Sequence, residues 1–190
     1  DLVRSRGLGD VYKRQGHSSL RIGKSTNQRA VTVSGGSVNV VNDYNVFGGA
    51  ITQNAAATSS AGSIFMNPTG NYAGSGALTA TSGTVRISGG AAVAPTGAIR
   101  ALETVTLSGT GAITNSGATL TSLTSSVDVT SRSSTVNISA AISAATTVAL
   151  TASSTVTTSA TVAAGTGQVT ITSQAADLSI GGATSGTSVE

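Results

Sequence analysis

The side chains that could carry out catalysis are few and widely spaced. His17 is the only histidine and cysteine is absent, so the sequence offers neither a Ser/His/Asp arrangement nor a thiol nucleophile. The carboxylates Glu103, Asp128 and Asp177 are far apart along the chain, whereas enzymes that cleave carbohydrates place acids in pairs. We therefore predict no catalytic residues, and we interpret His17 as a solvated loop residue.

Ligand-binding motifs are also missing from the sequence. It contains no calcium-binding glycine repeat, no phosphate-binding loop and no metal-ligand spacing. We interpret 88–90 and 181–182, which contain paired glycines, as turns rather than phosphate cradles. Apart from the first fifteen residues, the aromatic side chains are Tyr44, Phe47, Phe65 and Tyr72. These features predict no cofactor, no metal, no small-molecule substrate and no stacking surface for nucleic acid or sugars.

Composition leaves two structural classes open. Ser and Thr number 59 of the 190 residues, while charged residues make up only 9%. Such a chain is either a disordered Ser/Thr/Gly-rich segment or a repetitive β-structure. Disordered segments are usually charged and poor in β-branched residues, whereas Val, Ile and Thr abound here, which favours the β-structure. No apolar run is long enough for a transmembrane helix, and no secretory signal is visible.

The first fifteen residues differ from the rest of the chain. Residues 1–15 hold four basic and two acidic side chains, and 10–15 resemble the translation of a transposase end used in sequencing-library adapters. We predict a non-native leader here, with a short basic arm as the alternative. Without it, residues 16–190 carry six basic and five acidic side chains, or 6 − 5 = +1. The pI of about 9.8 is therefore no argument for a nucleic-acid partner.

Pairs of apolar residues two positions apart recur through most of the chain. Two-residue spacing predicts strands with one buried face, and the steps between successive pairs are 21, 20, 22, 21 and 21 residues. The pairs are Ile64/Met66, Val85/Ile87, Val105/Leu107, Val127/Val129, Val148/Leu150 and Val169/Ile171.

Two further families follow the same period, one starting at Tyr72 and the other at Leu78. They continue through Val93, Ile113, Val136, Val156 and Leu178, and through Ile99, Leu120, Ile142 and Val162. Three short strands per coil predict an all-β fold, a right-handed parallel β-helix with about 21 residues per coil. A two-sheet solenoid would show two longer strands per coil.

The periodicity divides the chain into three parts. We predict the leader over 1–15, an irregular β-rich lead-in over 16–60 and the solenoid over 61–190. Within the lead-in, 31–33 and 38–40 have the pattern of strands, and 42–62 has that of a looser coil or loop. In the solenoid, Arg86, Thr106 and Asp128 fall in one outward column, which we interpret as solvated surface charge.

One turn carries a resemblance to a known family. The apolar residues 64–66 precede Asn67-Pro68-Thr69-Gly70, a good turn sequence. This order resembles the Asn-Pro-Asn-Gly motif in the secretion domain of filamentous-haemagglutinin-like exoproteins, with Thr69 departing from it. More widely, the period and strands over 60–189 resemble β-helical passengers of haemagglutinin-type and autotransporter adhesins.

The resemblance implies a fragment of a large exported adhesin on the bacterial cell surface. Its partner would be an unidentified component of a host cell, another bacterium or a matrix, with outer-membrane association through other parts of the parent protein. The first alternative is a purely structural surface-layer or stalk repeat. A β-helical polysaccharide lyase ranks third, because the acids are scattered along the chain. No caps are evident in the sequence, so we expect residues 16–190 expressed alone to self-associate or to be only marginally stable.

Overall fold

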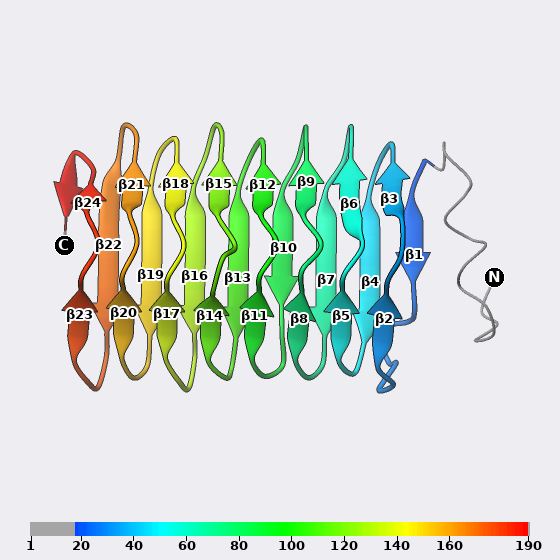
Figure 1. Ribbon diagram of the computed structural model, residues 1–190, viewed down its shortest axis with the longest axis horizontal. Coiled ribbons are helices and arrows are strands. Elements are labelled where there is room, and N and C mark those ends of the chain that lie inside the picture. The colour runs from blue at the N-terminus through cyan, green and yellow to red at the C-terminus, as the bar shows by residue number, and fades with distance from the viewer. Residues whose placement is uncertain (1–17, 190) are drawn as a thin grey trace.

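The computed structural model describes residues 18–189, and every regular element in that range is a β-strand. Three consecutive strands make one coil, and each strand pairs in parallel with the strands three places before and after it. Figure 1 shows the coils stacked side by side along the long axis of the molecule, from β1 to β25. The all-β solenoid predicted from the sequence, with about 21 residues and three strands per coil, is confirmed.

The strands form three sheets, which we number 1 to 3. Sheet 1 has nine strands: β1 (Leu20–Ile22), β4 (Tyr44–Gly48), β7 (Ile64–Pro68), β10 (Val85–Ser88), β13 (Val105–Gly109), β16 (Val127–Ser131), β19 (Val148–Ala152), β22 (Gln168–Ser173) and β25 (Ser188–Val189). Sheet 2 has eight: β2 (Val31–Val33), β5 (Ile51–Gln53), β8 (Tyr72–Gly74), β11 (Val93–Pro95), β14 (Ile113–Asn115), β17 (Val136–Ile138), β20 (Val156–Thr158) and β23 (Leu178–Ile180). Sheet 3 also has eight: β3 (Ser37–Val40), β6 (Ala56–Ser59), β9 (Leu78–Ala80), β12 (Ile99–Ala101), β15 (Leu120–Ser122), β18 (Ile142–Ala144), β21 (Val162–Ala164) and β24 (Thr184–Ser185).

Inward side chains of equivalent strands stack into continuous columns. In sheet 1, Val105 pairs with Val85 on one side and Val127 on the other, and all three are fully buried. The three apolar families predicted from the sequence are the inward columns of the three sheets. The backbone N–H and C=O groups of each coil pair with the coils on either side. The sheets therefore satisfy their hydrogen bonds around a thin apolar core and need no second layer.

The regular coils begin earlier in the chain than the sequence indicated. Strands at 31–33 and 37–40 match the prediction, but 42–62 is neither loose nor a loop, because β4, β5 and β6 pair in register with the next coil. Tyr44, Gln53 and Ala57 fill inward positions of this coil. The periodic spacing of large apolar residues is therefore weak over 42–62, although the strands there keep the register of the later coils.

Glycine allows the corners to fold closely. Gly35 and Gly36 connect β2 to β3 with positive φ angles of 77° and 62°, a region that glycine enters without steric cost. At Gly90, a Cβ atom would collide with the carbonyl oxygen of Thr69 in the preceding coil. The glycine pair at 89–90 thus lies in the corner between β10 and β11, a turn as predicted. At 67–70, Asn67 and Pro68 complete β7 and the bend itself lies at 69–70.

The buried serines Ser59, Ser122 and Ser131 lie at corners that hold one additional residue. The corner from Ser131 to Val136 is one residue longer than the corner from Ala152 to Val156. Ser131 Oγ donates to the Gly111 carbonyl of the preceding coil at 2.8 Å and accepts from the backbone N–H three residues ahead at 3.1 Å. The hydroxyl therefore satisfies backbone groups that the longer corner displaces from the ladder.

The same arrangement recurs at other corners. Ser59 and Ser122 each donate to a carbonyl of the preceding coil and accept from the N–H three residues ahead. Asn115, also fully buried, ends β14 before another long corner. Its amide nitrogen donates to the carbonyls of Ala118 and Ala140, and its oxygen accepts from the N–H groups of Ser139 and Ala140. The serine hydroxyls and the Asn115 amide therefore fix the long corners by hydrogen-bonding to their backbone N–H and C=O groups.

Candidate functional surfaces

The charged column predicted from the sequence lies on sheet 1. Arg86 pairs with Thr106, and Thr106 pairs with Asp128, so the three residues follow one another on successive coils as predicted. Asp128 Oδ2 accepts a hydrogen bond from Ser126 Oγ at 2.9 Å. Since Arg86 and Asp128 are two coils apart, roughly 10 Å by the strand spacing, they form no direct ion pair.

The other acidic residues between 18 and 189 lie apart from one another. Glu103 and Asp177 are exposed at corners of different coils, and Asp43 accepts a hydrogen bond from the Ser63 N–H at 2.9 Å. Over residues 18–189, no group of three or more His, Cys, Asp or Glu side chains could hold a metal ion. His17 lies outside the described residues.

The interior near the N-terminal end contains polar groups that serve packing. Tyr44 and Gln53 are fully buried, and the Tyr44 hydroxyl donates to Gln53 Oε1 at 3.1 Å. Gln53 Nε2 donates to the Ala55 carbonyl at 2.6 Å. Burial raises the pKa of the nearby Tyr72 hydroxyl well above its ordinary value, because the solvent that would stabilise a phenolate is excluded.

An aromatic and amide surface covers sheet 1 over β4 and β7. Asn45 pairs with Phe65, and Phe47 pairs with Asn67. All four side chains point outward and are partly exposed. Asparagine and phenylalanine therefore alternate across two coils in a two-by-two arrangement, which we call the Asn/Phe patch.

Arginine side chains border the Asn/Phe patch on both sides. Arg21 of β1 pairs with Asn45, and Arg86 of β10 pairs with Phe65. The Arg21 guanidinium lies over the Phe47 ring, 4.5 Å from its centroid, within the range of a cation–π interaction. Both arginines are exposed.

Sequence reasoning missed this patch and predicted no stacking surface. Phe47 and Phe65 are far apart in the chain and become neighbours only when the coils are placed in register. A signal was nevertheless present, because Asn45-Val46-Phe47 and Phe65-Met66-Asn67 have the same types in reverse order, one coil apart. The weak apolar rhythm before residue 60 concealed that register.

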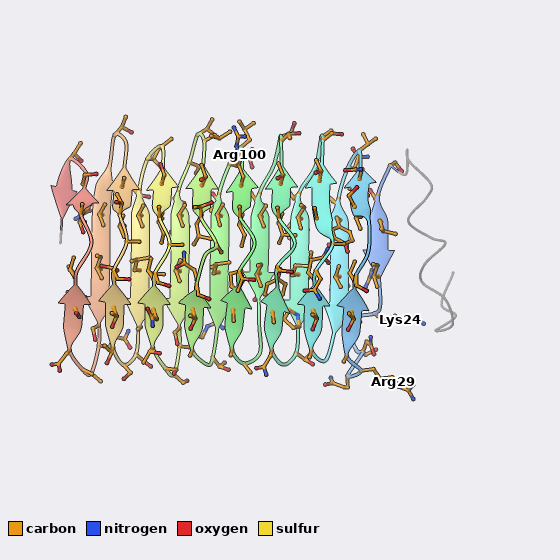
Figure 2. All side chains as sticks on the ribbon, in the orientation of Figure 1. Lys24, Arg29 and Arg100 are labelled. Carbon is orange, nitrogen blue, oxygen red and sulfur yellow. The ribbon has the colours of Figure 1, made fainter. Side chains whose placement is uncertain are left out.

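Charge is unevenly distributed along the solenoid. Residues 18–100 contain five basic side chains and one acidic side chain, or 5 − 1 = +4, whereas 101–189 contain one basic and three acidic, or 1 − 3 = −2. Lys24 and Arg29 lie near the N-terminal end of the solenoid, and Arg100 extends outward from β12 (Figure 2). The Asn/Phe patch thus lies in the positively charged half.

Apolar side chains are exposed in the last full coil. Leu178 and Ile180 of β23 are 45% and 44% exposed, although the equivalent Val156 of the preceding coil is fully buried. Strand β23 pairs only with β20 among the described strands. Within the described residues, the edge of β23 that faces away from β20 therefore has no strand partner and lies beside exposed apolar side chains.

No helix within residues 18–189 is long and apolar enough to cross a membrane. Comparison with known protein families, curated proteins and solved structures gives no match to the chain.

Proposed function

We propose that this chain is part of a large exported surface protein, in which the solenoid acts as an extended scaffold for adhesion. The observation that carries the proposal is the alignment of outward side chains into columns along three parallel sheets. Eight coils at the spacing of about 4.8 Å between strands give a rod of roughly 35–40 Å. Such a rod presents flat, repetitive walls to a partner and adds length by adding coils.

The interior supports a scaffold rather than a reaction centre. Its buried polar groups, such as Gln53, Asn115 and Ser131, hydrogen-bond to neighbouring backbone or side-chain atoms. The acids that a polysaccharide lyase would use lie on separate coils. We accordingly propose a non-catalytic protein, and a screen against polysaccharides should show no turnover with the purified chain.

The cell-surface location is part of the same proposal. The β-helical passengers that the sequence resembles are exported, and the solenoid fold is compatible with that class. The partner would be a component of a host cell, another bacterium or a matrix, and attachment to the outer membrane would come from other parts of the parent protein.

A structural stalk or surface-layer repeat is the second candidate. The outward positions of sheet 1 in the C-terminal coils favour it, because they carry mainly small side chains such as Thr130, Ala149 and Thr151. A protein that acts only as a spacer needs a regular outer surface without binding groups. On this hypothesis, the purified chain would build ordered assemblies but would not attach to cells.

Adhesion can be tested with beads coated with the full chain. We expect more attachment to epithelial cells, bacterial cells or extracellular matrix than with beads coated with the heat-unfolded chain, because binding depends on aligned columns. Equal attachment of folded and unfolded protein on every surface would refute the adhesion proposal. Ordered assembly under the same conditions would then support the stalk.

A further inference from the structure

The outer surface of sheet 1 near the N-terminal end combines three kinds of side chain. The Asn/Phe patch supplies two aromatic rings and two amides, and Arg21 and Arg86 border it. Adjacent coils place side chains about 4.8 Å apart along the rod, and alternate residues of one strand about 6.7 Å apart across it. Six side chains of complementary chemistry therefore share one flat surface of β1, β4, β7 and β10.

The polar groups of this surface are available to a ligand. Among the described residues, no hydrogen bond or ion pair engages the side chains of Asn45, Asn67 or Arg86. The Arg21 guanidinium lies over the Phe47 ring, and a cation–π contact of this kind uses none of its N–H donors as a conventional hydrogen bond, so they can donate to a ligand. A ligand can thus pair with these groups without breaking contacts that the fold requires.

Each kind of side chain recognises a different part of a carbohydrate. The ring of Phe65 can pack on the apolar face of a sugar ring, whereas Arg21 lies over the ring of Phe47. The amides of Asn45 and Asn67 can both donate to and accept from hydroxyl groups. The guanidinium groups fit carboxylates, because their parallel N–H donors match the two carboxylate oxygens.

Charge favours an anionic ligand over a neutral one. The half of the solenoid that holds the patch has a net charge of +4 over residues 18–100, and Asp43 is its only acid. Asp43 already accepts a hydrogen bond from the Ser63 N–H. Positive potential over a flat surface attracts polyanions and raises their rate of association.

We propose that the Asn/Phe patch, with Arg21 and Arg86, binds a linear polysaccharide that carries carboxylate groups. This site rests on the adhesion function proposed above and names its ligand class. A uronate chain lies across successive coils, with a sugar ring over Phe65 and carboxylates at the two arginines. A single-stranded nucleic acid fits less well, because it brings a phosphate with every nucleotide and the patch offers only two cations.

Calorimetric titration of the full chain with polygalacturonate tests the site. Replacing the exposed Arg86 with Gln (R86Q) removes a charge-assisted hydrogen bond and should weaken binding about tenfold. Phe65→Ala should also weaken binding about tenfold through lost ring stacking. Unchanged circular dichroism and melting of both variants would confirm that the fold persists.

Arg100→Gln is the matched control, since Arg100 belongs to the same coil as Arg86 but lies in sheet 3. It should change affinity less than about twofold, because it alters only the long-range field. Equal losses for the two arginine variants would overturn the site and indicate general electrostatic attraction. An unaffected Phe65→Ala variant or undetectable binding would also overturn it.

Two further probes define the ligand class. Dextran, a neutral polysaccharide, should bind much more weakly than polygalacturonate, and a single-stranded oligonucleotide that bound more tightly would overturn the carbohydrate proposal. The bead assay separates this inference from the adhesion function. Attachment to cells without polygalacturonate binding would refute the site and leave adhesion standing, whereas loss of both would refute both.

Discussion

The coils from β4 to β9 and those from β16 to β21 share one backbone arrangement but fill it differently. The first group encloses Tyr44, Gln53 and Tyr72, whereas the second encloses mainly Val, Ile and Ala. The outer surfaces differ as well, with aromatic and amide groups over the first and small side chains over the second. The backbone hydrogen bonds between parallel strands therefore set the register, and core side chains of different volume are accommodated within the same backbone arrangement.

The largest expected difference between the two groups concerns cavity formation. Tyr72 and Val156 occupy equivalent positions, because each is the first residue of a sheet 2 strand and points into the core. Tyr72→Ala should lower the free energy of unfolding by about 3–5 kcal/mol, since it empties an aromatic volume. Val156→Ala should lower it by roughly 1.5 kcal/mol, from the two carbons removed. Urea denaturation measures both, and equal losses would contradict the proposed difference in core filling.

The next prediction concerns the exposed apolar residues of the last full coil. Changing Leu178 and Ile180 to Lys should weaken self-association of the 190-residue chain about a hundredfold, because apolar contact is lost and like charges meet. Leu123→Lys is the control, since Leu123 is 43% exposed at a corner away from that end. Sedimentation equilibrium distinguishes them, and a chain that stays monomeric before any change would refute the association.

A smaller loss is expected at the buried amide of Asn115. Asn115→Ala removes hydrogen bonds to the long corner after β14 and should cost about 2 kcal/mol of unfolding free energy. Asn137→Ala, at an exposed position of the same sheet, should change it by less than about 0.5 kcal/mol. Similar effects in thermal or urea unfolding would show that the corner does not depend on its polar group.

Alkaline pH should destabilise the aromatic coils selectively. Burial raises the pKa of Tyr72 in the folded state above its ordinary value of 10.0, so the stability that depends on its neutral hydroxyl is complete below pH 10 and is lost as the pH rises through the folded-state pKa. The wild-type chain should lose about 1.4 kcal/mol per pH unit from this group between pH 10 and the folded pKa. Tyr72→Phe should lack this component, and identical pH profiles would argue against it.

The smallest predicted effect is a gain in the C-terminal coils. The buried hydroxyl of Thr158 has no hydrogen-bond partner among residues 18–189, and Thr158 follows Ile138 in the inward column of sheet 2. Thr158→Val keeps the shape and should raise the free energy of unfolding by about 1 kcal/mol. Ser131→Val is the opposing control, because Ser131 makes two backbone hydrogen bonds and should lose stability.

Sequence reasoning predicted the coil and its three inward columns because Val, Ile and Leu recur at nearly constant spacing. It placed the start of the solenoid too late, since Tyr44 and Gln53 occupy inward positions without continuing that pattern. The Asn/Phe patch was missed for a related reason. Its members Phe47 and Phe65 belong together only once the strand register is known.

Glu103, Asp128 and Asp177 lie on different coils. The ligand that we propose could not be predicted from composition. A ligand surface on a solenoid depends on which residues share a column and which lie one coil apart. Corners of unequal length obscure both relations in the linear sequence. Patterns of reversed triplets such as 45–47 and 65–67 offer a way to search for such surfaces in similar chains.

At the corners whose serine hydroxyls bond to the backbone, the number of residues in a coil can change without changing the distance between coils along the rod. A residue inserted after Ser131 enlarges one corner, yet the next strand still pairs with its neighbour at the ordinary spacing. Position along the rod is therefore counted in coils, at about 4.8 Å each, and not in residues. Corner insertions can accumulate during evolution without moving a surface patch along the axis, whereas duplicating one coil displaces everything beyond it by a fixed step.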